Sequence, residues 1–409
     1  MRVDALNNKK PELLCPAGNY EKLVYAVNYG ADAVYCALDR FGMRASAGNF
    51  TAEELVSGVE YAHAHGAKVY CTMNTMPRDG EFAHLPDYIR SVSAAGADAF
   101  IVSDPGVMDA VFKYASDPVV HLSTQASTVN SASVRFWSRL GVKRVVLARE
   151  LSLDEIKTIR DNIDPETELE CFVHGAMCVS YSGRCLMSNY FTGRDANKGR
   201  CAQPCRWKYH LTEDKNGYTA DAEQDDGGTY VFSSKDMNMI AHVRKLCEAG
   251  IDSFKIEGRM KSAYYTAALA NAYRIAIDDH FAGKPFDERC YSETESVSHR
   301  EYGTGYYFSS PGTDANVVHE NEYISDRPFL CTVGSYDVNT GLAKCVQRNK
   351  MTVGDKVNLL SPGGFGRDLV VGEMFDSEMQ PITSTPHPAM EFYLRIDGAK
   401  PMDIIRGGK

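Results

Sequence analysis

The stretch NYGADAVYCAL, residues 28–38, decides the fold, because a single glycine joins the end of a helical pattern to a buried strand. The same order recurs in AHGAKVYCTMN (64–74), AAGADAFIVSD (94–104), RLGVKRVVLARE (139–150) and EAGIDSFKIEGR (248–259). Glycine allows the left-handed backbone that stops a helix, and the apolar run after it is typical of a strand buried in a parallel sheet. We therefore predict repeated β/α units. The helix stops are expected at Gly30, Gly66, Gly96, Gly141 and Gly250.

Three further apolar runs complete a set of eight predicted strands. They are ELLCPAG near residue 12, PVVHLSTQ near 118 and ELECFVHG near 168. Helices are expected over 51–65 and 152–159, the second of which starts with a Ser152/Glu155 capping box. No glycine-rich dinucleotide loop follows the first strand, so a TIM-like (β/α)8 barrel is favoured over an open doubly wound sheet.

The β/α rhythm stops after a helical pattern that ends near residue 281. Residues 283–327 are rich in Tyr, Ser, Gly and Pro and are predicted to connect two domains. Short strand patterns follow, FLCTVGSYD, GLAKCVQRN, GDKVNLLSP, RDLVVGEMF and MEFYLRID. We expect a barrel domain at 1–282, with a cysteine-bearing insertion at 176–235 after the seventh strand. A small antiparallel β-barrel domain is expected at 328–409.

Composition narrows the class of protein. The first ten residues lack the apolar core of a signal peptide, and no run of about 18 apolar residues is present, so we expect a cytoplasmic protein without a membrane partner. A net charge of −10 argues against non-specific coating of nucleic acid. In a reducing compartment the twelve cysteines are expected to be buried thiols, metal ligands or catalytic groups.

Polar residues follow the predicted strands, where barrel enzymes carry their active sites. Arg149 and Arg259, with Arg44 of FGMRASAG, are expected to bind an anionic small molecule, and Gln125 is placed with them as a substrate-binding residue. His174 and Glu257 are expected to transfer or orient a proton. Cys15 ends the first strand and is a weaker candidate for catalysis.

Four cysteines in one segment form the strongest chemical signal. Cys178, Cys185, Cys201 and Cys205 have the spacing Cys-x6-Cys-x15-Cys-x3-Cys. Structural zinc sites usually use tighter pairs, whereas an iron–sulfur cluster tolerates looser spacing. The spacing favours a cluster, and a zinc site or unligated buried thiols remain as alternatives. Segment 178–208 also carries six basic residues against one acidic residue, Asp195, so it is a local patch able to bind phosphates.

Absent motifs limit the alternatives. The sequence contains no His-Glu-x-x-His, no Gly-x-Ser-x-Gly, no Walker loop and no Cys-x3-Cys-x2-Cys. A protease would need an activated nucleophile or an activated water, and no recognisable constellation supplies either.

Several motifs together resemble the peptidase U32 family, the collagenase-like peptidases. They are ELLCPAGNYEKLVYAVNYGADAVYCAL, HLSTQAS, ECFVHGAMCVSYSGRCLMS, CAQPCRW, SSKDM and SFKIEGR. Proteins of this family with a similar architecture make 5-hydroxyuridine at the tRNA wobble position, hydroxylate a cytidine in ribosomal RNA, or take part in oxygen-independent ubiquinone synthesis. The resemblance implies a tRNA uridine 5-hydroxylase. A ribosomal RNA hydroxylase and a collagenase-like endopeptidase are the alternatives.

The resemblance also implies a [4Fe-4S] cluster and a requirement for prephenate as cosubstrate. Cys178, Cys185 and Cys201 match the first three ligand positions of the family motif, and Cys205 is the expected fourth, because residues 209–235 contain no cysteine. With tRNA as partner, four basic residues of the segment are expected to bind phosphates. They are Arg184, Lys198, Arg200 and Arg206. The neighbouring Tyr181, Tyr190, Phe191 and Trp207 either stack a splayed base or pack the cysteine segment.

Overall fold

The computed structural model describes residues 9–43, 48–207, 209, 233–308 and 323–408 of the chain. Eight parallel strands close into a barrel, because β1 pairs with both β2 and β9, and β9 pairs in turn with β7. These strands are β1 (Glu12–Pro16), β2 (Ala33–Cys36), β3 (Lys68–Met73), β4 (Ala99–Val102), β5 (Val120–Leu122), β6 (Val142–Val146), β7 (Glu168–Ala176) and β9 (Ser253–Ile256). The eight predicted strands and the TIM-like barrel are confirmed.

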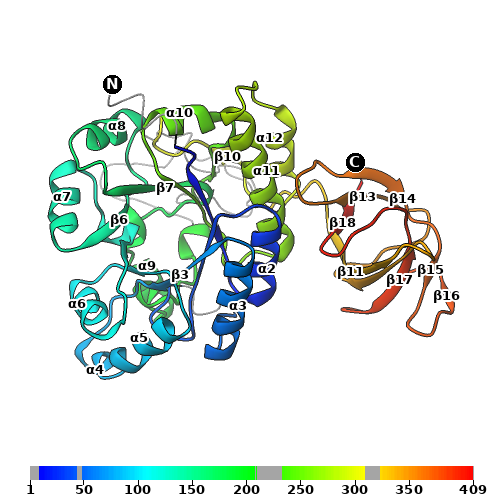
Figure 1. Ribbon diagram of the computed structural model, residues 1–409, viewed down its shortest axis with the longest axis horizontal. Coiled ribbons are helices and arrows are strands. Elements are labelled where there is room, and N and C mark those ends of the chain that lie inside the picture. The colour runs from blue at the N-terminus through cyan, green and yellow to red at the C-terminus, as the bar shows by residue number, and fades with distance from the viewer. Residues whose placement is uncertain (1–8, 44–47, 208, 210–232, 309–322, 409) are drawn as a thin grey trace.

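Helices surround the barrel (Figure 1). They are α2 (Tyr20–Asn28), α3 (Ala52–Ala64), α4 (Asp79–Phe82), α5 (Leu85–Ala94), α6 (Pro105–Tyr114), α7 (Ser131–Arg139), α8 (Leu153–Asp161), α10 (Val243–Glu248), α11 (Ala263–Phe281) and α12 (Glu288–Glu295). All five predicted stop glycines have positive φ, from 74° to 105°. The capping box of Ser152 and Glu155 is formed at the start of α8.

The barrel interior contains a buried layer of charge. Arg144 is 4% exposed and donates to Glu12 at 2.5 Å and to Glu170 at 3.1 Å. Glu170 also accepts from Lys255 at 2.8 Å. Each charge therefore has a partner of opposite sign, which is the condition under which proteins bury charges.

The segment after β7 leaves the barrel and returns to it. It contains α9 (Met187–Thr192), and the chain comes back as β8 (Asp236–Asn238), which pairs antiparallel with the end of β7. A further short strand, β10 (Tyr302–Gly303), pairs with β8. The insertion is therefore anchored at both ends on the same barrel strand.

The C-terminal region forms a separate antiparallel sheet, a half-barrel with its own hydrophobic core. Its strands are β11 (Phe329–Asp337), β12 (Leu342–Gln347), β13 (Lys356–Leu360), β14 (Arg367–Val370), β15 (Met374–Phe375), β16 (Pro381–Ile382), β17 (Glu391–Arg395) and β18 (Ile404–Gly407). Their order in the sheet is β14-β13-β18-β11-β12-β17-β15-β16. Four of the five sequence patterns cover β11, β12, β13 and β17, and the fifth covers both β14 and β15; β16 and β18 were not predicted.

This sheet contacts the barrel on the side of α11 and α12 (Figure 1). Arg406 of β18 is fully buried and donates to both carboxylate oxygens of Glu293 in α12, at 2.6 and 2.7 Å. Asn271 of α11 exchanges two hydrogen bonds with the backbone of Gly363 and Gly364. Polar contacts with good geometry therefore join the two domains.

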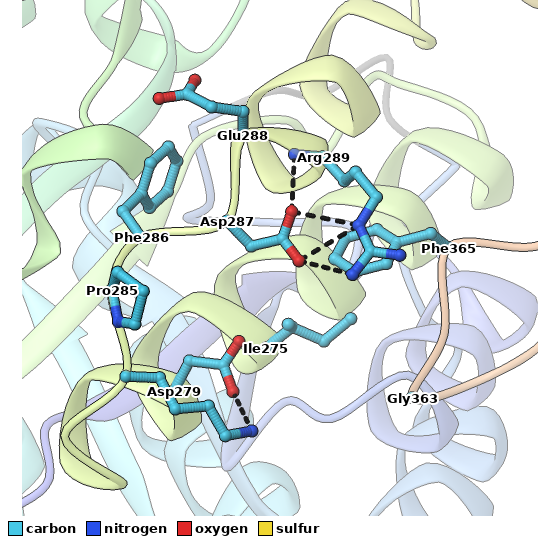
Figure 2. A pocket seen from close by; sticks show the side chains of 10 residues that line it. Ile275, Asp279, Pro285, Phe286, Asp287, Glu288, Arg289, Gly363 and Phe365 are labelled. Carbon is cyan, nitrogen blue, oxygen red and sulfur yellow. Dashed lines mark hydrogen bonds and ion pairs between the residues drawn. The ribbon is translucent and has the colours of Figure 1, made fainter.

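A hollow of about 660 Å³ lies near this contact, between residues 285–289 and 363–365. Figure 2 shows the side chains that line it. Asp287 binds Arg289, whose guanidinium lies 4.4 Å from the Phe365 ring centroid, and Asp279 binds Lys284. Most charged groups of this hollow thus pair with each other. No helix among the described residues has the length and apolar character needed to cross a membrane.

Candidate active site

A pocket of about 810 Å³ lies at the carboxyl ends of the barrel strands, under the cysteine segment. Residues from the ends of β3, β6 and β9 line it, together with all four cysteines of the segment. Parallel barrels place their strand ends at one mouth, so side chains that are far apart in sequence meet here. The pocket is therefore the candidate active site.

Side chains of the segment and of the barrel fix its conformation. Glu150, which follows β6, accepts the backbone N–H and the hydroxyl of Ser182 at 2.7 and 3.2 Å. Asn197 accepts the N–H of Cys185 at 3.3 Å and donates to its carbonyl at 3.1 Å. Polar side chains that bond to backbone groups order irregular chain in the way that caps order helix ends. The cysteine segment is thus attached to the mouth by specific contacts.

The four thiols of the segment lie near one another and differ from the other eight. Cys178, Cys185, Cys201 and Cys205 are partly exposed, whereas the remaining cysteines are buried. Burial raises the pKa of Cys205 to about 11. The neighbouring thiols of the other three cysteines add to this shift, and the Arg206 guanidinium opposes it. The four sulfur atoms are therefore close enough to interact electrostatically.

Backbone groups point at two of these sulfur atoms. The N–H of Met187 donates to Cys185 Sγ and the N–H of Gln203 donates to Cys201 Sγ, each at 3.3 Å. Such donors stabilise thiolate, the form that binds metal. Among the described residues, no three His, Cys, Asp or Glu side chains are arranged to hold one metal ion. A [4Fe-4S] cluster takes one thiolate per iron, so its four ligands do not converge on a single point, and the donor set fits such a group.

Three of the predicted anion-binding residues line the pocket at the mouth. Arg149 stacks over the Phe172 ring at 4.3 Å and donates to the Ala176 carbonyl at 3.0 Å. Arg259 is 2% exposed and contacts the Thr72 hydroxyl at 3.4 Å. Arg149, Arg259 and Gln125 line the pocket, whereas Arg44 lies outside the described residues.

Two buried polar atoms of this group lack a hydrogen-bond partner among the described residues. They are Gln125 Oε1 and Arg149 Nε. A buried polar atom without a partner is costly, and both residues line the pocket. A ligand with a donor for Gln125 and an acceptor for Arg149 would satisfy both.

The two residues predicted to handle protons have different surroundings. Glu257 lines the pocket and accepts from the Tyr35 hydroxyl at 3.3 Å. His174 is 1% exposed, does not line the pocket, and lies between Tyr273 and Tyr302, with ring nitrogens 3.4 and 3.3 Å from their hydroxyls. Burial, reinforced by His299, lowers the pKa of His174 to about 3, so its ring is neutral at pH 7. We therefore keep for His174 only an orienting role.

Cys15, the weaker catalytic candidate, is fully buried and does not line the pocket. Burial raises the pKa of this thiol far above its usual range. Because the nucleophile is the thiolate, this position is structural.

The basic residues of the segment occupy distinct positions. Arg184 and Arg200 are exposed, while Lys198 pairs with Glu81. Arg206 points inward, donates to the Met177 carbonyl at 2.8 Å and lines the pocket. The exposed positive charge of the segment therefore comes mainly from Arg194 and Arg200, and from Arg184, whose Nε donates to the Gln125 carbonyl at 2.6 Å.

Aromatic side chains are exposed beside these arginines. Tyr181, Tyr190, Phe191 and Trp207 expose 52, 86, 48 and 42% of their surface. The Phe191 ring centroid lies 5.4 Å from that of Tyr190 and 6.4 Å from that of Trp207. We call Tyr190, Phe191 and Trp207 the aromatic surface. Packing within the segment thus leaves much of these rings exposed.

Gly175 positions Glu257 and gives a first testable prediction. Its φ is +106°, and a Cβ atom there would lie 2.5 Å from the Glu257 carbonyl oxygen. Gly175→Ala should therefore lower the free energy of unfolding by at least about 3 kcal/mol, measured by urea denaturation.

Gly183→Ala is the matched control for this substitution. Gly183 also has positive φ, +79°, but a Cβ would meet no heavy atom within 4 Å. Gly183→Ala should therefore lower the free energy of unfolding by only about 1–2 kcal/mol, the cost of backbone strain. Equal losses for the two variants would contradict the role of the Glu257 contact.

Residues that the sequence patterns did not single out also line the pocket. Lys255, Lys261 and Arg300 are the charged ones. Lys261 lies two residues after the Glu257–Arg259 motif, but Arg300 lies in the connecting region and no sequence signal placed it at the mouth.

A closed (β/α)8 barrel with a thiol-bearing segment over its mouth defines a TIM-barrel protein. Comparison with known families identifies the family of this chain. The model of Peptidase family U32 matches residues 18–316, and that of the Peptidase family U32 C-terminal domain matches 326–406. The chain belongs to peptidase family U32.

Curated relatives carry two kinds of name. The chain is 38% identical over 407 residues to the tRNA hydroxylation protein P1 of Bacillus subtilis, covering 98% of this chain and 96% of that protein. It is 38% identical over 395 residues to the tRNA hydroxylation protein P of Escherichia coli, covering 87% of each. It is also 37% identical over 367 residues to a protein of Porphyromonas gingivalis named Collagenase, covering 86% of each.

Proposed function

We propose that this protein is an RNA-modifying redox enzyme that hydroxylates a tRNA wobble uridine to 5-hydroxyuridine without molecular oxygen. The observation that carries the proposal is the position of the four thiols in the barrel-mouth pocket, in a chain similar along 98% of its length to a tRNA hydroxylation protein. Replacing hydrogen by hydroxyl at a pyrimidine carbon is a net two-electron oxidation, so a cosubstrate has to supply the oxygen atom and be reduced by the two electrons. A redox centre beside the substrate pocket suits this chemistry.

The residues proposed to hold a [4Fe-4S] cluster are Cys178, Cys185, Cys201 and Cys205. When bound, such a cluster supplies one-electron transfer. The Arg206 guanidinium next to Cys205 opposes the rise in the pKa of that thiol and would offset the negative charge of the ligands. Glu257, which accepts a hydrogen bond from the Tyr35 hydroxyl, is the proposed acid–base group.

Prephenate is the proposed cosubstrate, and the support for it is the pair of guanidinium groups at the mouth. Arg149 and Arg259 both line the pocket and can bind carboxylates in a bidentate manner. Gln125 offers an unpaired buried acceptor beside them.

The aromatic surface is the proposed base-stacking platform for the tRNA loop, with Arg184 and Arg200 binding phosphates. Phe191→Ala should weaken tRNA binding by about tenfold, since stacking on an aromatic side chain contributes about 1–3 kcal/mol per base. Filter binding at fixed ionic strength measures this.

Phe136→Ala on α7 is the control for the stacking test. Phe136 has the same exposure, 48%, and also contacts a neighbouring aromatic ring, Trp137, at 5.2 Å. Its replacement should leave the tRNA affinity unchanged. If both variants weaken binding alike, the aromatic surface is not the platform.

Mass spectrometry of nucleosides from a deletion strain tests the proposed function directly. 5-Hydroxyuridine should disappear from tRNA and return with the wild-type gene. Ribosomal RNA from the same strain serves as the second sample, because loss of a hydroxycytidine there, with tRNA intact, would instead support the ribosomal RNA hydroxylase.

An endopeptidase is the second candidate, because the Porphyromonas gingivalis relative is named Collagenase. Purified metal-free protein would then cleave gelatin and lose that activity on one point substitution in the pocket. The proposed redox function expects no such cleavage and a brown protein when it is prepared without oxygen.

A further inference from the structure

Three cationic side chains lie at one side of the pocket, beside β8. Arg206, Lys261 and Arg300 all line it. Lys261 Nζ lies 4.3 Å from the centroid of the Tyr323 ring and the Arg300 guanidinium 4.6 Å from the same centroid. Lys261 and Arg300 therefore both lie against the same ring.

Protein contacts hold each cation in place. Arg300 is 3% exposed and donates to Asp236 at 3.2 Å and to the Tyr323 hydroxyl at 2.7 Å. Lys261 donates to the Ser298 carbonyl at 2.8 Å. A carbonyl oxygen carries no formal charge, so this contact orients the ammonium group without neutralising it.

The cations repel one another. Burial lowers the pKa of Lys261 to about 8, and Arg300 and Arg206 reinforce this shift, while Asp236 and Glu257 oppose it. Like charges in a partly buried pocket are unfavourable, and a bound anion removes that cost. Such perturbed groups in a cleft are typical of ligand-binding sites.

We propose that Lys261, Arg300 and Arg206 form an anion subsite that binds a carboxylate group of a small-molecule substrate, in addition to the site of Arg149 and Arg259. Two groups of cations in one pocket suit a ligand with two carboxylates. The low exposure of Arg300 favours a small molecule over an RNA backbone phosphate. The choice of a dicarboxylate rests on the proposed function.

Lys261→Met tests the subsite, since methionine keeps most of the side-chain length and removes the charge. Prephenate binding, measured by isothermal titration calorimetry on the full-length protein, should weaken by about 10- to 100-fold, as expected for loss of a charge-assisted hydrogen bond. Lys284→Met, at an exposed pair with Asp279, should change nothing. Circular dichroism checks that both variants are folded.

The test separates the subsite from the proposed function. Malonate, a minimal dicarboxylate, is titrated alongside prephenate. Binding of either probe that depends on Lys261 supports the subsite even when the nucleoside analysis is negative. Unchanged binding of both probes in Lys261→Met overturns the subsite. A loss of tRNA affinity alone also overturns it, because that result would assign these cations to RNA phosphate.

The dependence on pH provides a second readout. The affinity of the wild type for prephenate should fall between about pH 7 and about pH 9, as Lys261 loses its proton. Arginine keeps its charge over this range, so Lys261→Arg should bind prephenate with little dependence on pH. An identical pH profile for the two proteins would contradict the role of Lys261.

Discussion

Cys185→Ala is expected to abolish 5-hydroxyuridine formation and to lower bound iron. The substitution removes one of the four proposed thiolate ligands, and an iron left with three protein ligands is easily lost. Even partners that only orient metal ligands cost about 10- to 100-fold in affinity or activity when replaced. A direct ligand should therefore cost at least about a hundredfold. Iron content, visible absorption and nucleoside analysis of tRNA measure the effect.

Cys247→Ala provides the control of identical chemistry. Cys247 is buried in α10 and does not line the pocket. Its replacement should preserve iron and product. If Cys185→Ala retained both as well, the proposed ligand set would be wrong. Stoichiometric zinc in the wild type, without iron, would favour the zinc alternative.

Arg406→Met should produce the largest loss of stability. Arg406 is fully buried and is held by Glu293 of α12, so its removal leaves a carboxylate in the domain contact without its partner. Breaking a buried pair in this way typically costs about 3–5 kcal/mol. Urea denaturation, followed by tryptophan fluorescence and circular dichroism, measures the free energy of unfolding.

Two further variants identify the cause of this loss of stability. Arg395→Met removes a surface pair with Glu373, in which both side chains are about half exposed, and should cost no more than about 1 kcal/mol. The double variant Arg406→Met, Glu293→Gln should recover part of the loss, because no buried charge remains unpaired. No recovery in the double variant would mean that packing, not charge, sets the cost.

The barrel could be predicted from sequence because each unit repeats the same local signals. A stop glycine and an apolar run act over a few residues, and Gly30 and Gly66 illustrate that no distant contact is needed to interpret them. The strand at 404–407 was missed for the opposite reason. Its Arg406 is buried, and a charged residue breaks the apolar pattern unless its partner, here in α12, is known.

The site was predicted less completely than the fold. The cysteines and the arginines after β6 and β9 follow from their positions at strand ends. The structure places His174 outside the pocket lining, at a point where β7 shifts register against β9 between Phe172 and His174, and its role stays a prediction. Lys261 and Arg300 meet only through tertiary structure.

The return of the chain through β8 has a consequence for how this protein family can diversify. Ala176 and Asp236 are direct partners across β7 and β8, so the excursion between them begins and ends about one strand spacing apart, ~4.8 Å. Evolution can lengthen, shorten or exchange such an excursion while the cylinder beneath it keeps its closure. The cysteine segment and the barrel can therefore change independently of each other. Chimaeras that exchange the segment between Ala176 and Asp236 should fold.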